Sequence, residues 1–231
     1  MPLDGAGVSA GEAVRAAIAW LESEADPTTR GDMGRRYGIH TDRAMGVPMA
    51  RMKVLARDLG TDHALAAGLW ASGWYEARIV AAMVDDPAAV GAEQMDAWCR
   101  DFDNWAIVDT VCFNLFDRTA DAWPKVDQWA DSDQEFVRRA AFALLWSLAL
   151  HDRDAADDRF AHGLELIERH AADERHLVNK AVGMALRAIG KRRPTLTASA
   201  LATAERLAAS SDPAARRVGR PAVKELRALA P

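Results

Sequence analysis

Apolar residues recur every three or four positions along almost the whole chain, and hardly any segment alternates strictly between apolar and polar residues. This spacing predicts amphipathic helices rather than strands. β-branched residues are sparse while alanine, leucine and arginine are plentiful, which also favours helix. We therefore predict an all-α protein with helices at residues 10–24, 43–60, 63–84, 92–118, 121–130, 134–151, 157–171, 174–190, 195–209 and 213–229.

Short polar segments separate the predicted helices. Asp-Pro occurs at 26–27, 86–87 and 212–213, and this pair suits a helix start because Asp caps free amides and Pro fits the first helical position. Ser132 and Asp133 precede another apolar run and are candidate caps of the same kind. No Asn-Gly dipeptide occurs, so the strongest short hairpin signal is missing.

About ten helices with short connections predict a stack of antiparallel pairs. Helix pairs of roughly 40 residues are the unit of HEAT-like solenoids, which present a concave groove lined by one helix from each pair. We predict one HEAT-like α-α superhelix over residues 1–231, in which residues 1–30 form an N-terminal helical part without an assigned function. A compact all-α bundle is the alternative architecture.

Composition and charge narrow the possible functions. Hydrophobic residues make up 50% of the chain and charged residues 27%, as expected for a folded globular protein. The formal net charge of -5 means that a polyanion would bind only at a local basic patch on an otherwise acidic protein.

The cysteines and the N-terminus indicate the cellular compartment. Cys99 and Cys112 lie in predicted helices, where we expect reduced core thiols. The N-terminus does not resemble a signal peptide, and no apolar run approaches the roughly 20 residues of a membrane span, so we expect a cytoplasmic protein.

The stretch DNWAIVDTVC places a carboxylate on an apolar helical face. At about 100° per residue, Trp105, Val108, Cys112 and Phe116 share one narrow arc, and Asp109 lies within it. A buried carboxylate is costly unless it is paired or hydrogen-bonded. Asp109 therefore either pairs with a structural group or stands at the edge of a groove, with Trp105 as a flat apolar wall.

A second unusual helix is the one predicted at residues 134–151, which is apolar nearly all round. Arg139, Phe142 and Trp146 lie opposite its main core stripe. Either both sides of the helix are buried and Arg139 forms an ion pair, or the second side faces a groove. Arginine beside aromatic rings suits a phosphate or base partner.

The densest basic cluster lies in NKAVGMALRAIGKRRP, residues 179–194. It is either a solvated helix end, where the dipole favours cations, or a stripe that follows a nucleic-acid backbone. Met184 at its centre favours a surface that faces a groove. The cations of this cluster are Lys180, Arg187, Lys191, Arg192 and Arg193.

Other motifs contribute less. Trp70, Trp74, Glu76 and Arg78, in LWASGWYEAR, are predicted to pack between repeats. The acidic and histidine residues of 151–163 match no metal-binding spacing, and we interpret them as a solvated connection between helices. Neither a phosphate-binding GxxxxGK[ST] nor a nucleophile-elbow GxSxG occurs.

Five segments together resemble the bacterial DNA alkylation repair family of HEAT-like-repeat DNA glycosylases, in order and over residues from about 35 to 225. They are YGIHTDRAMGVPM, LWASGWYEAR, DNWAIVDTV, FVRRAAFALL and NKAVGMALRAIGKR. The resemblance implies a monofunctional enzyme that hydrolyses the N-glycosidic bond of cationic N3- or N7-alkylated purines in duplex DNA. It implies no metal and no organic cofactor. We expect a monomer without a membrane partner, associated with the nucleoid when bound to DNA.

The resemblance also implies roles for individual residues. An aspartate and two tryptophans of this family face the damaged nucleotide, and an arginine contacts its backbone. Asp109 and Trp105 match the aspartate and the first tryptophan, and Arg139 matches the arginine, with Arg138 as the alternative. Met184 stands where the second tryptophan would fall, so the apolar contact is kept but the flat π face is lost. We predict DNA contacts from Arg138, Lys180, Met184, Arg187, Lys191, Arg192 and Arg193.

Three hypotheses follow from these patterns. In the first, Asp109 stabilises the positive charge that develops on the sugar as the damaged base leaves, and the protein is a glycosylase. In the second, the protein binds duplex DNA in a salt-dependent way but has lost the chemistry, which Met184 favours. In the third, the solenoid is a protein-interaction scaffold, a common use of helical repeats.

Overall fold

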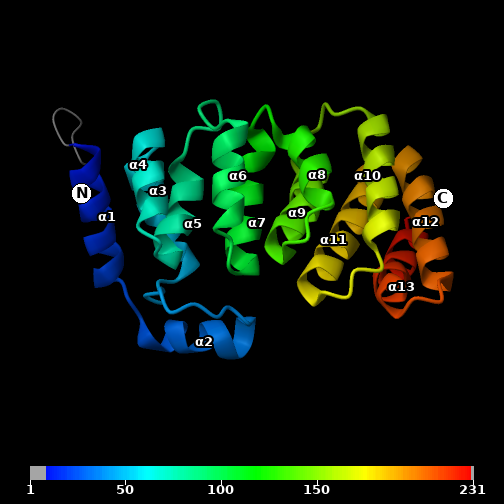
Figure 1. Cartoon of the computed structure of the whole chain (residues 1–231), viewed down its shortest axis with the longest axis horizontal. Helices are drawn as coiled ribbons and strands as arrows, with labels where there is room; N and C mark the ends of the chain where they lie inside the picture. Colours follow the sequence, from blue (N-terminus) through cyan, green and yellow to red (C-terminus); the bar gives the residue numbers. More distant parts are fainter. Residues whose placement is uncertain (1–8, 230–231) are drawn as a thin grey trace. The chain divides into compact units, whose positions relative to one another are not determined.

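The computed structural model describes residues 9–229, and within them it contains thirteen α-helices, one short 3₁₀ helix and no strand (Figure 1). The all-α prediction is therefore confirmed for this part of the chain, and predictions for residues 1–8 lie outside it. The elements are α1 (Ala10–Ser23), α2 (Pro27–Tyr37), α3 (Met49–Leu59), α4 (His63–Ala71), α5 (Tyr75–Val84), α6 (Ala92–Arg100), α7 (Trp105–Asn114), η1 (Phe116–Arg118), α8 (Ala122–Ala130), α9 (Glu135–His151), α10 (Asp157–His170), α11 (His176–Arg192), α12 (Pro194–Ala209) and α13 (Pro213–Arg227).

Two segments predicted as single helices are interrupted, because 63–84 forms α4 and α5, and 92–118 forms α6, α7 and η1. The segment 63–84 breaks between α4 and α5 at Gly73, whose φ of 74° lies in the left-handed region. The segment 92–118 breaks before α7, where the Asn104 side chain accepts hydrogen bonds from two amides of the next turn and starts a new helix. The apolar stripe continues across both breaks, which is why periodicity alone did not reveal them.

Helix α2 was missed by the sequence analysis because its sequence, PTTRGDMGRRY, has almost no apolar stripe. Its ends are nevertheless well marked. The Asp26 side chain accepts from the amides of Thr28 and Thr29, and Gly38 ends the helix with a φ of 63°. Residues 43–48, predicted as the start of a helix, instead form the connection that leads into α3.

The predicted caps had mixed outcomes. Asp26 and Asp212 cap α2 and α13 through their side chains, as predicted. No helix starts at Asp86, whose side chain accepts only from the amide of Ala88 in a turn. The predicted caps of α9 were wrong, because this helix has Gln134 at its N-cap without a side-chain cap hydrogen bond.

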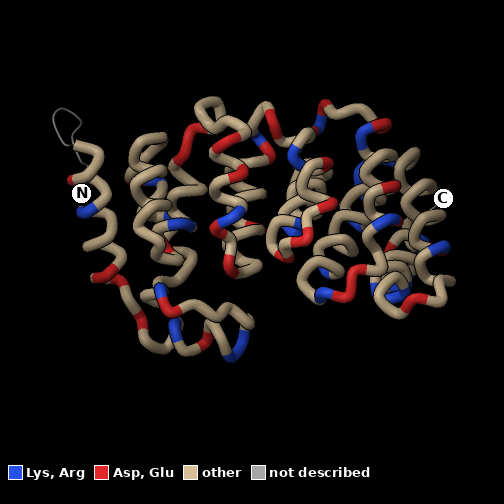
Figure 2. Tube along the Cα trace, in the orientation of Figure 1, with Lys and Arg blue, Asp and Glu red and all other residues tan. Residues whose placement is uncertain are grey.

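The chain divides into two compact units. The first comprises residues 1–95 and 103–119, and the second comprises residues 96–102 and 120–231. Acidic and basic residues are interspersed in both (Figure 2). The single domain expected from the sequence stays a prediction.

Each unit is built from packed helix pairs. In the first unit, α5 contacts α4, α3 and α7, and α1 contacts α4. In the second unit, α11 contacts α9, α12 and α13, while α12 and α13 pack against each other. The α12–α13 contact is close, because a Cβ atom added at Gly219 would lie 2.3 Å from the amide nitrogen of Ala208. A side chain at this position is therefore excluded by backbone atoms.

Both cysteines are buried, and neither forms a disulfide within residues 9–229, as predicted. Burial raises the pKa of the Cys99 thiol well above its usual range, which keeps this thiol protonated and unreactive. None of the helices in the described part of the chain combines the length and apolarity required to cross a bilayer.

Candidate functional site

Helix α7 carries the carboxylate and the tryptophan that the sequence analysis singled out. Because Asn104 caps the helix, Trp105 is its first residue and Asp109 follows one turn later. Cys112 and Phe116 are fully buried, although Phe116 belongs to η1 rather than to α7. Trp105 and Asp109 are only partly exposed. The face is thus buried at its C-terminal end and partly open where the two predicted catalytic side chains lie.

The Trp105 indole is held in place by helix α2. Its Nε1–H donates a hydrogen bond of 2.9 Å to the carbonyl of Tyr37, the last residue of α2. The Tyr37 ring is 53% exposed, and the Arg36 guanidinium lies 5.9 Å from its centroid. The helix that the periodicity missed therefore supplies a fixed anchor to the candidate site.

A buried carboxylate holds the connection between α2 and α3. Glu76 is fully buried, and its side chain accepts hydrogen bonds from the amides of Met45, Gly46 and Val47, the shortest being 2.7 Å from Gly46. Gly46 has a φ of 85°, and a Cβ added there would lie 2.4 Å from the carbonyl oxygen of Asp26. Glu76 therefore fixes a loop that rests directly on the first turn of α2.

In LWASGWYEAR, Trp70 and Arg78 pack as predicted, whereas Glu76 has another role. Trp70 is 4% exposed, and the Arg78 guanidinium lies 5.0 Å from its ring centroid, as expected for packing residues. Trp74 has the Arg43 guanidinium 5.5 Å from its ring centroid. Glu76 differs from the prediction, because its side chain accepts hydrogen bonds from backbone amides of a loop rather than from side chains of a neighbouring repeat.

Arg139, the predicted backbone contact, is a buried residue of the second unit. It is 1% exposed, and its Nη1 donates a hydrogen bond of 2.6 Å to the carbonyl of Leu177 in α11. This burial agrees with the structural alternative weighed for Arg139, and its contact with DNA stays a prediction. Arg138, the other candidate, forms an ion pair of 2.8 Å with Asp173.

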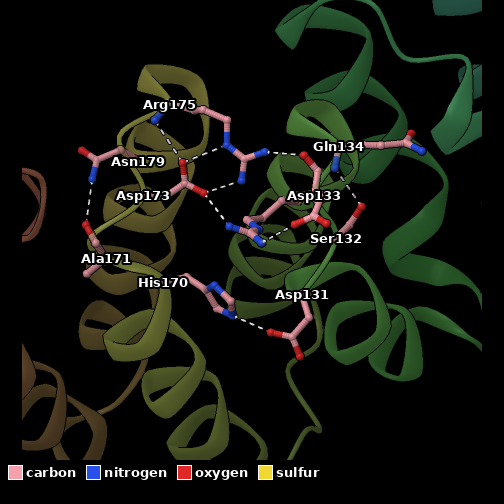
Figure 3. A network of polar contacts seen from close by, with 10 residues as sticks. Asp131, Ser132, Asp133, Gln134, His170, Ala171, Asp173, Arg175 and Asn179 are labelled. Carbon is pink, nitrogen blue, oxygen red and sulfur yellow. Dashed lines mark hydrogen bonds and ion pairs between the residues drawn. The ribbon is translucent and has the colours of Figure 1, made fainter.

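Asp173 is the centre of a polar network that joins the segment before α9 to the segment before α11 (Figure 3). It accepts hydrogen bonds from Arg138 and Arg175, and Arg175 also donates to the carbonyl of Asp133 at 2.7 Å. His170 lies 3.0 Å from the Asp131 carboxylate in the same region. The network sets the position of the first turns of α9 and α11.

The network predicts a specific dependence of stability on pH. Burial would raise the pKa of Asp173, but hydrogen bonds from Arg175 and Arg138 outweigh burial and lower this pKa to about 2. A carboxyl group whose pKa is lowered on folding stabilises the protein above its unfolded pKa of about 3.9, and this contribution is lost as the pH falls through 2. We expect Asp173→Asn to lower the free energy of unfolding at pH 7 by about 2 kcal/mol.

Urea denaturation of the Asp173→Asn variant and the unmodified protein at several pH values measures this effect. The difference between the two should shrink from pH 5 towards pH 2. Asp154→Asn is a matched control, because Asp154 is an exposed carboxylate in the same unit. A difference that does not depend on pH would contradict the assignment of the lowered pKa to Asp173.

The basic cluster predicted on α11 has an N-terminal part, with Lys180 and Met184, and a C-terminal part from Arg187 onwards. In the N-terminal part, Lys180 is exposed and Met184 is partly buried. At the C-terminal end of the cluster, the cations have structural partners. Arg187 and Lys191 pair with Glu225, Arg193 pairs with Asp157, and Arg192 donates to the carbonyls of Ala149 and Asp152.

Helices α11 and α13 line an open cavity of about 630 Å³, and Lys180 and Arg187 are part of its lining. The sequence analysis missed the contribution of α13, which supplies Arg216, Arg217 and Arg220. Arg220 follows Arg216 by four residues and Arg217 by three, and this spacing could have placed Arg220 beside both of them on a helix surface.

Comparisons with known proteins agree with this fold. A model of the DNA alkylation repair enzyme family matches residues 17–225. A solved structure described as a new family of proteins related to the HEAT-like repeat DNA glycosylases, with affinity for branched DNA structures, is similar with a TM-score of 0.74. That similarity covers 83% of this chain and 82% of the other at 21% sequence identity. No curated protein matches the sequence.

The structural similarity confirms the predicted HEAT-like fold. The family match spans nearly the whole chain and includes both α7 and α11. The resemblance noted in the sequence is thereby confirmed. The chain belongs to the family of DNA alkylation repair enzymes.

Proposed function

We propose that the protein is a monofunctional DNA glycosylase that releases cationic N3- or N7-alkylated purines from duplex DNA. The observation that carries the proposal is the placement of Asp109 one helical turn from Trp105 at the partly exposed end of an otherwise buried face. Membership of the DNA alkylation repair family supports the same reading. The residue types suit a substrate that carries positive charge.

The chemistry of the proposed reaction requires a negative group near the sugar. When the N-glycosidic bond breaks, its electron pair leaves with the purine, which becomes neutral, and positive charge moves to the sugar. The Asp109 carboxylate stabilises this charge without any rearrangement of solvent, because it is already fixed on α7. A water molecule oriented by the same carboxylate then adds to the anomeric carbon and transfers a proton to that carboxylate, which later releases it to solvent.

Trp105 contributes a preorganised surface. Its indole ring is tied through Nε1 to the carbonyl of Tyr37, so its orientation does not depend on the substrate. The π face of an indole attracts cationic rings and the C–H edges of a sugar that is developing positive charge. The proposed role of Trp105 is therefore to favour the cationic nucleotide beside Asp109.

The test is incubation of the purified protein with duplex DNA that has been methylated, followed by chromatography of the freed bases. We expect 7-methylguanine and 3-methyladenine in the soluble fraction, and an abasic site in the DNA without strand cleavage. Absence of freed base at all protein concentrations would refute the glycosylase assignment.

A second candidate function is DNA binding without base release. Met184 favours it, because methionine lacks the π face of the tryptophan that the family resemblance implies at this position. The similar solved structure is described as having affinity for branched DNA. Under this alternative, a four-way junction would bind in a salt-dependent way and no base would be released from methylated DNA.

A further inference from the structure

The cavity between α11 and α13 differs in charge from three other cavities of the described residues, each of which is lined in part by carboxylates. Among the described residues, its lining contains five Lys or Arg side chains together with His176, and no Asp or Glu. Asp127, Asp96 and Glu168 are each part of the lining of another cavity. A cavity lined in this way concentrates positive potential on a protein whose net charge is -5.

Two of these cations are available to a ligand. Arg217 and Arg220 are exposed on α13, and their side chains form no hydrogen bond or ion pair within residues 9–229. In contrast, Arg187 and Arg216 already have partners within the protein. Arg187 pairs with Glu225 at 3.1 Å, and Arg216 donates to the carbonyls of Ser210 and Ser211. The free cations therefore lie on the α13 side of the cavity.

A side-chain hydrogen bond joins the two helices that line the cavity. The Asn179 side chain donates to the carbonyl of Ala171 and, at 3.1 Å, to the carbonyl of Ala214 at the start of α13. It is itself part of the cavity lining. One buried amide thus ties α11 to the start of α13, so the backbone that carries the lining is ordered before a ligand enters.

The nature of the lining identifies the chemical class of the ligand. Pockets for small organic molecules are lined mostly by apolar and aromatic side chains. Here, five of the ten described lining residues are Lys or Arg, and the imidazole of His176 is the only aromatic ring among them. Arg217 and Arg220 are three residues apart, so their Cβ atoms lie about 5–6 Å from each other. A row of separate guanidinium groups suits a row of phosphates better than a single anion.

We propose that the cavity between α11 and α13 binds the phosphodiester backbone of DNA, with Arg217 and Arg220 as its main phosphate contacts. The proposal rests on the proposed DNA-binding function and adds to it a phosphate-binding site on α13. The site carries affinity rather than chemistry, because its two main contacts are arginines, which stay protonated and do not act as general bases, and no carboxylate of the described residues lines the cavity.

The test compares three proteins by fluorescence anisotropy with a labelled 20-base-pair duplex, from 50 to 200 mM KCl. They are the unmodified protein, the double variant Arg217→Ala with Arg220→Ala, and the control double variant Arg153→Ala with Arg169→Ala. The control removes two exposed arginines of the same unit that do not line the cavity. Thermal melting followed by circular dichroism verifies that all three are folded.

Each phosphate contact contributes about 0.9 to the slope of log affinity against log salt. We therefore expect the slope to be smaller by about 2 in the cavity variant and unchanged in the control. The affinity of the cavity variant at 50 mM KCl should be at least about tenfold lower. Equal affinity and slope in the cavity variant and the unmodified protein would overturn the proposal.

Inorganic pyrophosphate serves as the second probe, because it offers the same phosphate chemistry without a nucleic acid. We expect it to displace the duplex only at millimolar concentrations. Displacement at micromolar concentration would assign the cavity to a small anion and overturn the backbone proposal. If the unmodified protein binds duplex DNA through the cavity but releases no base, the glycosylase proposal fails while this one stands.

Discussion

Replacement of Asp109 by asparagine is expected to lower the rate of 7-methylguanine release from methylated duplex DNA by at least about a hundredfold, the effect of removing one group that stabilises transition-state charge. Asparagine has nearly the same shape as aspartate but no negative charge, so the developing sugar cation loses its partner. Asp109 is partly exposed on α7, and we expect the variant to remain folded. Single-turnover release measured by chromatography reports the chemical step directly.

Asp58→Asn is the matched control for this measurement. It removes one negative charge from an exposed residue on α3 of the same unit, so the change in net charge is identical. Release by the control should equal release by the unmodified protein. Duplex binding by Asp109→Asn should be undiminished, because a negative charge repels the DNA backbone. Normal base release by Asp109→Asn would remove the carboxylate from the proposed mechanism.

Replacement of Glu76 by alanine is expected to destabilise the protein by about 4 kcal/mol or more, because hydrogen bonds to a charged group contribute about 1.5–3 kcal/mol each. Three buried amides, those of Met45, Gly46 and Val47, lose their acceptor together. The loop that they form rests on α2, so the anchor of Trp105 at Tyr37 is weakened as well. We therefore expect slower base release in addition to lower stability.

Urea denaturation and amide hydrogen exchange measure the two parts of this prediction. Exchange at Met45, Gly46 and Val47 should accelerate more than exchange in α5. Glu93→Ala is a suitable control, because Glu93 is an exposed residue in the first turn of α6, and its loss should cost no more than about 1 kcal/mol. Unchanged stability of Glu76→Ala would show that the loop is held by other contacts.

The type and approximate extent of most helices followed from the sequence, because apolar periodicity is a local property. Seven helices lie within two residues of their predicted bounds, namely α1, α8, α9, α10, α11, α12 and α13. The breaks inside 63–84 and 92–118 depend on a glycine conformation and on an asparagine cap, neither of which disturbs the apolar stripe. Helix α2 depends on its caps and on tertiary contacts instead of an apolar face.

The candidate site was only partly predictable. The shared face of Trp105 and Asp109 follows from helical geometry, and the structure agrees with it. The pattern placed Arg139 on a second face of its helix, but periodicity does not reveal whether such a face meets another helix or solvent. In the structure Arg139 is buried and donates to the carbonyl of Leu177, thirty-eight residues away.

The sequence by itself determined that this protein is a stack of helices with Trp105 and Asp109 one turn apart on an otherwise buried face, because both depend on the repeat of a single helix. Only the tertiary structure decided which polar side chains form hydrogen bonds with other elements and which remain exposed to solvent. The hydrogen bonds from a distant loop to Glu76, the anchor of Trp105, and the cavity between α11 and α13, which no carboxylate of the described residues lines, arise where separate helices meet. Such contacts depend on the directions of side chains in space, which the spacing of residues along one helix does not encode.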